Sequence, residues 1–171
     1  MFDVFIGQHE NKIDAKARLS IPADFRKVID QGHQDREPGT PATFLLVFGD
    51  ERTPYLEGMT LARLKKITKQ IRRMPKSDPR RNQLEEAIYE KSQQLVLDDT
   101  GRIVLPARGR DKLGISANDT VVFAGRGDSF RLWKPDAHAT ATERPPADPA
   151  IDYDPDRDPM DYLDGDEDDE E

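Results

Sequence analysis

The chain has 171 residues, a net charge of −8, no cysteine, and 35% each of apolar and charged residues. These values exclude a disulfide scaffold, a thiolate metal site and a cysteine nucleophile, and they indicate a small core or a part that does not fold. The N-terminus lacks the basic stretch of a signal peptide, and no apolar run reaches the roughly 18 residues of a membrane span, so we expect a soluble, cytoplasmic protein.

The chain repeats itself at a constant offset. The segment DAKARLSIPADFR (14–26) aligns with DDTGRIVLPARGR (98–110), with five identities in 13 positions. Further along, TFLLVFGD (43–50) resembles TVVFAGRGD (120–128). Because an internal duplication dictates the architecture, we expect two similar β units.

Each copy of the repeat predicts two strands joined by a tight turn and followed by a short helix. The four strands are expected at 8–13, 18–21, 92–97 and 102–105. Pro22 and Pro106 suit the first turn of a helix, where a missing N–H costs nothing. The apolar runs 43–48 and 120–124 predict buried strands, and the alternating segment 129–133 predicts a last one.

Two helices are predicted between the copies. Apolar residues recur at spacings of three and four from Leu61 to Met74. Asp78 as N-cap and Pro79 as first residue begin the second helix. The other face of the first helix is basic, with Arg63, Lys65, Lys66, Lys69, Arg72 and Arg73. This face is either solvated, a contact for nucleic-acid phosphates or a dock for the protein's own acidic tail, and the sequence does not choose among these.

The charge is distributed unevenly, because residues 143–171 hold 14 of the 34 acidic residues and 2 of the 26 basic ones. This segment carries −12, which leaves +4 on residues 1–142. A basic segment (residues 1–142) followed by an acidic tail indicates a polyanionic partner for the basic segment. Five prolines amid dense carboxylates predict that the tail is disordered.

Both predicted turns carry the pattern Asp-x-x-x-Arg. Asp14, Asp98 and Arg102 are expected to stabilise these turns through local ion pairs, and pairs such as Asp98-Asp99 to bond nearby backbone N–H groups. Arg18 differs, because it shares its turn with Lys12 and Lys16 and is followed by Arg26 and Lys27 on the next helix. Arginine suits planar contacts with phosphate or guanine edges. We therefore expect the first copy to read a polyanion and the second to be its structural partner.

Neither catalytic nor metal-binding patterns are present. The three histidines lie far apart without ligand spacing, and the sequence has no nucleophile motif and no glycine-rich phosphate loop. We expect no enzyme, no metal, no cofactor and no small-molecule substrate.

Several segments together resemble one family. They are MFDVFIGQ, KIDAKARLSIPADFR, the basic helix, DDTGRIVLP and GRGDSFRLW. They are similar to the MraZ transcriptional regulators of the SpoVT-AbrB superfamily over residues 1–137. The resemblance implies a mainly β fold with short helices (α+β), in which repeats at 7–57 and 91–137 interlock into a pseudo-twofold swapped-hairpin β-barrel. A helical connector at 58–90 and a disordered acidic tail at 138–171 complete this expected organisation.

The resemblance also implies a function. Such proteins form homo-oligomeric rings in the cytoplasm, associate with the nucleoid, and repress the promoter of the division and cell-wall gene cluster, including their own gene, by binding short direct repeats in double-stranded DNA. Carried onto this sequence, the DNA-binding residues are Lys12, Lys16, Arg18, Arg26 and Lys27. The alternative is an AbrB-like antitoxin or protein-interaction module that binds DNA only incidentally.

This sequence departs from the family pattern at three positions. Ala17 stands where a glycine usually precedes the turn arginine, which implies a strained or altered turn if the backbone there has positive φ. Ile6 replaces a frequent basic residue. Gly109 replaces an apolar helical residue, which predicts a weak helix in the second copy.

Overall fold

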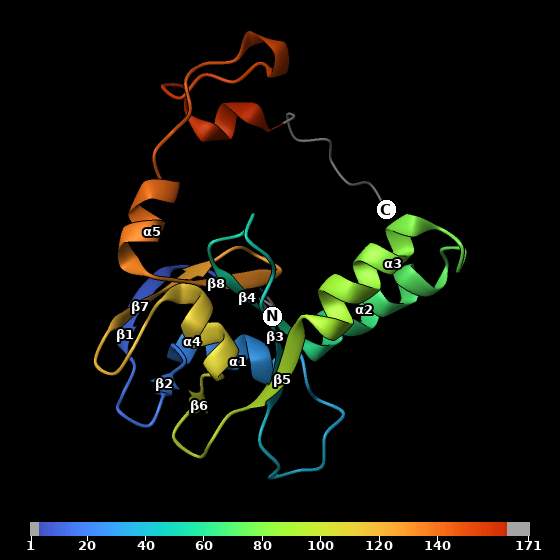
Figure 1. The fold of residues 1–171 in the computed structure, drawn as a ribbon, viewed down its shortest axis with the longest axis vertical. Helices are drawn as coiled ribbons and strands as arrows, with labels where there is room; N and C mark the ends of the chain where they lie inside the picture. Colours follow the sequence, from blue (N-terminus) through green and yellow to red (C-terminus); the bar gives the residue numbers. More distant parts are fainter. Residues whose placement is uncertain (1–3, 164–171) are drawn as a thin grey trace. The chain divides into compact units, whose positions relative to one another are not determined.

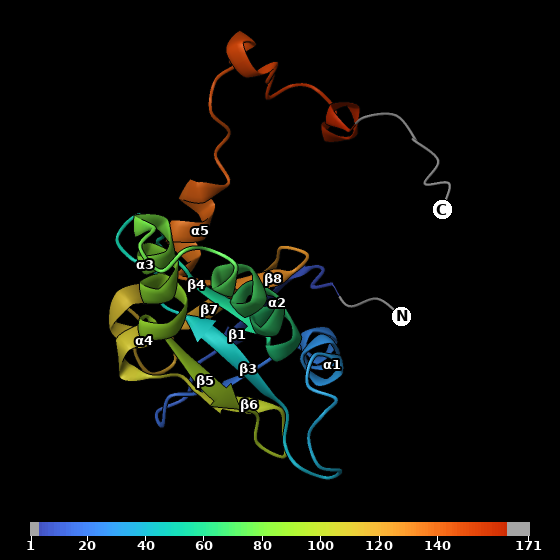
Figure 2. The same cartoon turned by 90° about the vertical axis from the view of Figure 1, so that its right-hand side faces the viewer.

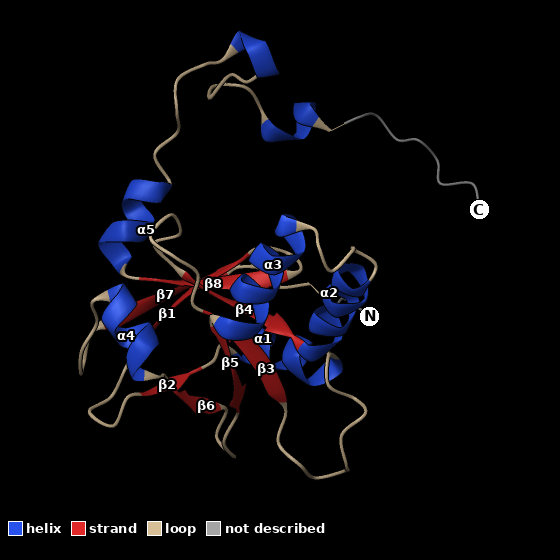
Figure 3. Cartoon of the chain, turned by 45° about the vertical axis from the view of Figure 1, so that its right-hand side comes forward, coloured by secondary structure: helices blue, strands red, loops and turns tan. Residues whose placement is uncertain are grey.

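The computed structural model describes residues 4–163 and divides after His138 into two compact units. Figure 1 shows the fold of the chain, and Figure 3 colours its strands and helices. As predicted, the elements are mainly strands with several short helices. In the repeats they are β1 (Gln8–Lys12), β2 (Arg18–Ser20), α1 (Ala23–Gln31), β3 (Thr43–Val47), β4 (Leu56–Thr60), β5 (Ser92–Val96), β6 (Arg102–Val104), α4 (Ala107–Leu113), β7 (Thr120–Gly125) and β8 (Ser129–Trp133). The others are α2 (Leu61–Arg72), α3 (Pro79–Glu85), the π-helical turn η1 (Glu86–Glu90), α5 (Pro135–Ala141) and the 3₁₀ turns η2 (Pro149–Ile151) and η3 (Pro159–Tyr162).

The two copies of the repeat exchange strands. Six antiparallel strands form one sheet in the order β1-β7-β8-β4-β3-β5, and β2 pairs with β6 in a separate two-stranded ribbon. Each outer strand therefore pairs with a strand of the other copy, β1 with β7 and β5 with β3. If each strand of the first copy is exchanged with its counterpart in the second (β1 with β5, β3 with β7, β4 with β8), the same strand order results, read from the other edge. The sheet therefore has pseudo-twofold symmetry. The ladders form two separate sheets, and the expected closed barrel is not confirmed.

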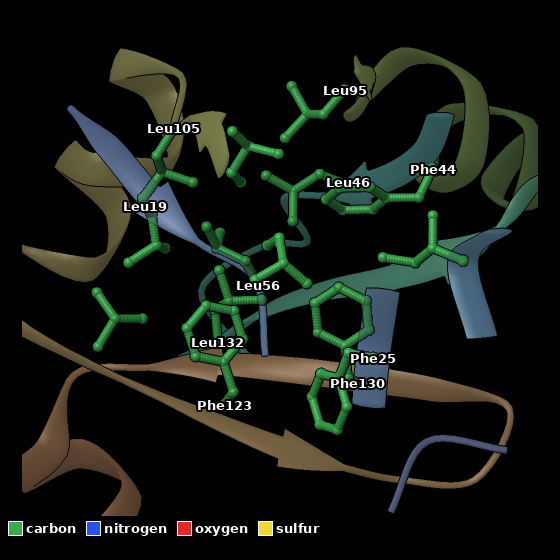
Figure 4. Packing of buried hydrophobic residues seen from close by; sticks show 14 of the residues in the cluster. Leu19, Phe25, Phe44, Leu46, Leu56, Leu95, Leu105, Phe123, Phe130 and Leu132 are labelled. Atoms are coloured by element: carbon green, nitrogen blue, oxygen red, sulfur yellow. The ribbon is translucent and has the colours of Figure 1, made fainter. Parts of the chain in front are cut away.

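The core is built from both copies. Leu19 on β2 and Ile103 on β6 are buried with the apolar strands of the large sheet. Phe25 from α1 lies 5.2 Å, ring centre to ring centre, from Phe130 on β8, and Phe44 from β3 lies 5.6 Å from the same ring. Figure 4 shows these rings and leucines from both copies meeting in one cluster. The two copies therefore share one core.

The helix of each repeat begins at a proline, as predicted. The helix α1 buries Phe25, Val28 and Ile29 on one side. The helix α4 is shorter, but it forms despite Gly109. A Cβ at that position would lie 2.9 Å from Cδ1 of Leu56, so the glycine lets α4 approach β4 closely.

The connector consists of α2 and α3, which lie side by side (Figures 1 and 2). The Thr60 side chain caps α2 by accepting from the Arg63 backbone at 3.1 Å. Asp78 caps α3 and Pro79 is its first residue, as predicted. Four elements were not predicted, namely β4, α5, η2 and η3, and the π-helical geometry of η1 was not predicted either.

The expected disorder after residue 137 is not confirmed over 138–163. In that stretch α5, η2 and η3 form, and Tyr153 and Tyr162 stack with ring centres 6.3 Å apart. The rest of the predicted acidic tail, 164–171, lies outside the described residues. In residues 4–163 no helix is long and apolar enough to span a membrane.

Candidate nucleic-acid interface

Two turns with the same hydrogen bonds flank the β2–β6 ribbon, and we call residues 12–18 the first tip and 96–102 the second tip. At the first tip, Asp14 Oδ1 accepts from the backbone N–H groups of Lys16 at 2.9 Å and Arg18 at 2.8 Å. Its Oδ2 accepts from Arg18 Nε at 2.7 Å. These hydrogen bonds lower the pKa of Asp14, and the bond from the Arg18 backbone contributes most.

The second tip repeats this pattern. Asp98 Oδ1 accepts from the backbone N–H groups of Thr100 at 2.9 Å and Arg102 at 2.8 Å, and Oδ2 accepts from Arg102 Nε at 3.0 Å. The backbone bond from Arg102 is the main reason why the pKa of Asp98 falls to about 2. At physiological pH both aspartates are therefore charged and committed to their turns.

The two turn arginines keep hydrogen-bonding capacity for a ligand. Within residues 4–163, the guanidinium groups of Arg18 and Arg102 donate only through Nε. Their side chains are 35% and 34% exposed. In the ribbon Arg18 lies opposite Val104, and Arg102 lies opposite Ser20. Leu19 and Ile103 between them are buried, so by strand alternation these four side chains share the outer face of the ribbon.

Ala17 has the left-handed backbone expected for a glycine. Its φ is +62°, close to the +78° of Gly101 at the corresponding position of the second tip. The predicted strain at Ala17 is therefore present, at a cost of about 1–2 kcal/mol for a residue with a Cβ. The turn keeps its geometry because the carbonyl of Ala17 accepts from the Leu105 backbone at 2.8 Å, across the repeat boundary.

The structure divides the five candidate DNA-binding residues between the tips. The first tip carries Lys12, Lys16 and Arg18. Arg26, on α1, contacts the second tip instead, because its Nη1 donates to the carbonyl of Thr100 at 3.1 Å. Lys27 follows it on α1 and lines a groove beside the second tip. This division follows from the pairing of β2 with β6 of the other copy. Directly after β2, the Ile21 backbone N–H donates to the carbonyl of Gly101 at 3.0 Å, which brings the start of α1 to the second tip.

A groove lies beside each tip. The groove at the second tip measures about 540 Å³ and is lined by Arg26, Lys27, Asp98 and Asp99, among others. The groove at the first tip measures about 510 Å³. The residues that correspond there to Arg26, Lys27, Asp99 and Thr100 are Arg110, Asp111, Ala15 and Lys16. The backbone is thus pseudo-symmetric, while the charges on the two tips differ.

Asp98 and Asp99 both lie in the turn, as predicted, but only Asp98 bonds the turn backbone. Asp99 is exposed, and in the described part of the chain it makes neither a hydrogen bond nor an ion pair. In the sequence, Asp99 differs from its counterpart in the first copy, Ala15, by carrying a carboxylate, and this difference was the only sign that the two positions have different roles.

The basic face of α2 lies outside both tips. Three of the basic residues between 63 and 81 have acidic partners, in the pairs Lys65–Asp35, Arg80–Asp78 and Arg81–Glu85. The others make no ion pair with any residue in 4–163, and they are Arg63, Lys66, Lys69, Arg72, Arg73 and Lys76. This face can attract a polyanion. No three His, Asp or Glu side chains in the described ranges gather to hold a metal ion.

Comparison with known proteins identifies the family. A family model described as "MraZ protein, putative antitoxin-like" matches residues 88–149. The chain is 41% identical over 144 residues to the transcriptional regulator MraZ of Cereibacter sphaeroides (strain ATCC 17025 / ATH 2.4.3), covering 81% of this chain and 84% of the relative. It is 35% identical over 162 residues to that of Ruegeria sp. (strain TM1040), covering 94% and 95%. It is 33% identical over 144 residues to that of Rhodospirillum rubrum, covering 83% and 86%. The chain therefore belongs to the MraZ family of transcriptional regulators.

Proposed function

We propose that this chain is a sequence-specific repressor that binds double-stranded DNA with its two tips and the ribbon between them. The proposed target is the promoter of the division and cell-wall gene cluster, including the chain's own gene. The observation that carries the proposal is the pair of Asp-x-x-x-Arg turns on one β-ribbon. Each turn fixes its arginine through Nε and leaves the terminal nitrogens to donate to phosphates or guanine edges.

The electrostatics of the tips support this proposal. Asp14 and Asp98 form ion pairs with the arginines of their own turns. Lys12, Lys16 and Lys27 make no ion pair with any residue in 4–163, so their charges are available to a ligand. Such cations supply phosphate contacts, which set affinity and salt dependence, while base-edge contacts set the choice of sequence. The proposal includes no catalytic step, no cofactor and no small-molecule substrate.

The proposal extends to the assembly. Repeats at 7–57 and 91–137 would interlock as a swapped-hairpin barrel around a connector at 58–90, leaving the segment 138–171 outside. Several such chains in a ring would engage successive direct repeats, which raises avidity without new contacts. A protein that acts on a promoter in this way would be cytoplasmic and nucleoid-associated.

The proposal is tested by fluorescence anisotropy with a duplex from upstream of the chain's own gene cluster. A scrambled duplex of equal length is the control, and both are titrated over a salt series. We expect clear preference for the upstream duplex and a steep decrease of affinity with salt. Equal, weak binding to both duplexes would contradict the proposal and favour the alternative of an antitoxin or protein-interaction module, to which the description of the matching family model points.

Arg18 is the residue on which we expect the upstream duplex to depend most. Arg18→Ala should weaken its binding by about 5- to 150-fold, the range for losing one bidentate base contact. Arg18→Lys keeps the charge and should restore little of the loss. The matched control is Arg52→Ala, because Arg52 makes a similar ion pair with Asp50 at 2.6 Å in another turn. If Arg18→Ala bound like Arg52→Ala, with unchanged size on gel filtration, the first tip would not be the reader.

A further inference from the structure

Asp99 is a carboxylate without a partner among the described residues, at the edge of the groove that Arg26 and Lys27 also line. Its neighbour Asp98 accepts four hydrogen bonds within the turn, and Asp99 accepts none from the described residues. Arg26 is held close by, since its Nη1 bonds the carbonyl of Thr100, the next residue. Lys27 lines the same groove. None of these cations comes within ion-pair distance of Asp99.

This arrangement restricts what Asp99 can contact. A phosphate drawn to Arg26, Lys27 or Arg102 is repelled by the Asp99 carboxylate, so Asp99 weakens simple phosphate binding. An ionised carboxylate accepts hydrogen bonds and donates none. In the major groove of DNA the donors are the exocyclic amino groups of cytosine and adenine, and a single carboxylate suits the N4 amino group of cytosine.

We propose that Asp99 is a specificity-determining residue that accepts a hydrogen bond from the N4 amino group of a cytosine, while Arg26 and Lys27 hold the neighbouring phosphates. This inference rests on the proposed DNA binding and deepens it. It gives the second tip, expected from the sequence to be only a structural partner, a reading role of its own.

The proposal also gives the chain a direction on DNA. Two identical tips related by a pseudo-twofold axis would read a palindrome. Here Asp99 and Thr100 of the second tip stand against Ala15 and Lys16 of the first. The carboxylate of the first tip, Asp14, is already bonded within its turn, and Ala15 stands at the position of Asp99, so the two tips read different base pairs. A reader with such polarity fits direct repeats better than inverted ones.

The test is a panel of duplexes in which each base pair of the upstream site is replaced in turn, with binding measured by anisotropy. Asp99→Ala should lose the preference of the wild-type chain at one C·G pair by about 10- to 150-fold and keep it elsewhere. Asp99→Asn keeps an amide oxygen that can accept from the N4 amino group, so it should lose less of this preference. Asp99→Ala should bind the scrambled duplex as well as the wild type or better, because a negative charge is removed. Both variants should fold normally, since Asp99 is exposed and unpartnered in the described part of the chain.

The matched control is Asp24→Asn, which removes an exposed carboxylate two residues before Arg26 that makes no ion pair with residues 4–163. It should change affinity slightly and equally for all duplexes. If Asp99→Ala did the same, Asp99 would act only by repulsion and the inference would be overturned while the proposed function stood. Loss of the oligomer in Asp99→Asn would also overturn it, by assigning Asp99 to contact with another copy. A wild-type chain with no sequence preference would overturn both proposals.

Discussion

At the scale of single residues, small differences between the repeats change what equivalent positions do. Gly101 has no Cβ, and a Cβ there would overlap the Arg26 guanidinium, so the glycine lets Arg26 lie against the second tip. Ala17 carries a Cβ in the same left-handed conformation, and the corresponding Arg110 donates instead to the carbonyl of Leu105 in its own copy. The methyl group of Ala17, which Gly101 lacks, thus goes together with a different position of the equivalent arginines, Arg110 and Arg26.

Replacing Ala17 by glycine should stabilise the chain. The change removes about 1–2 kcal/mol of left-handed strain, but glycine gives back roughly 0.4–1 kcal/mol through the entropy of the unfolded chain. Ala17 also packs against the core, so part of the gain is lost with its methyl group. The difference predicts that the free energy of unfolding, measured by urea denaturation, rises by about 0.5 kcal/mol. Ala17→Val, which adds a β-branch at positive φ, should be destabilising, and a stable valine variant would contradict the strain argument.

At the scale of elements, local patterns predicted most strands and helices, because alternation, apolar spacing and caps are local signals. The strand 129–133 and the start of α3 at Pro79 were predicted correctly. The strand β4 was missed because Leu56–Thr60 has a glycine at its centre and runs directly into α2. The placement of Arg26 on the second tip was not predictable locally, because it depends on pairing between β2 and β6, which belong to different copies of the repeat.

The contact between α1 and the second tip can be measured by a double-mutant cycle. Gly101→Ala should destabilise the chain by more than the roughly 1–2 kcal/mol of left-handed strain, because the new Cβ also displaces Arg26. Arg26→Ala should cost little and should relieve part of the penalty when combined with Gly101→Ala. We expect a coupling of about 0.5–3 kcal/mol in urea denaturation. Strictly additive effects would show that Arg26 does not rest on the second tip in solution.

At the scale of the whole molecule, the duplication indicated two similar units but not how they share strands. The exchange of β1 and β5 joins apolar residues of both copies in one buried cluster, and no short sequence pattern records it. The uneven charge, by contrast, is readable directly. A chain of net −8 with a basic body is a poor ligand for DNA as a whole, and the acidic segment accounts for the difference.

Deleting residues 143–171 should therefore strengthen DNA binding in a salt-dependent way. The deletion changes the net charge from −8 to +4 and leaves the core intact, because the buried cluster lies between Phe5 and Leu132. We expect roughly tenfold tighter binding at about 0.01 M salt, where the Debye length is near 30 Å, and little difference at 1 M, where it is near 3 Å. The ratio between upstream and scrambled duplexes should stay the same, since phosphate attraction carries no sequence information. A full-length chain in which the acidic residues after 142 are changed to Asn and Gln separates the charge of the segment from its bulk. This variant should bind DNA like the deletion variant. If it bound like the wild type, the effect would come from the presence of the segment and not from its charge.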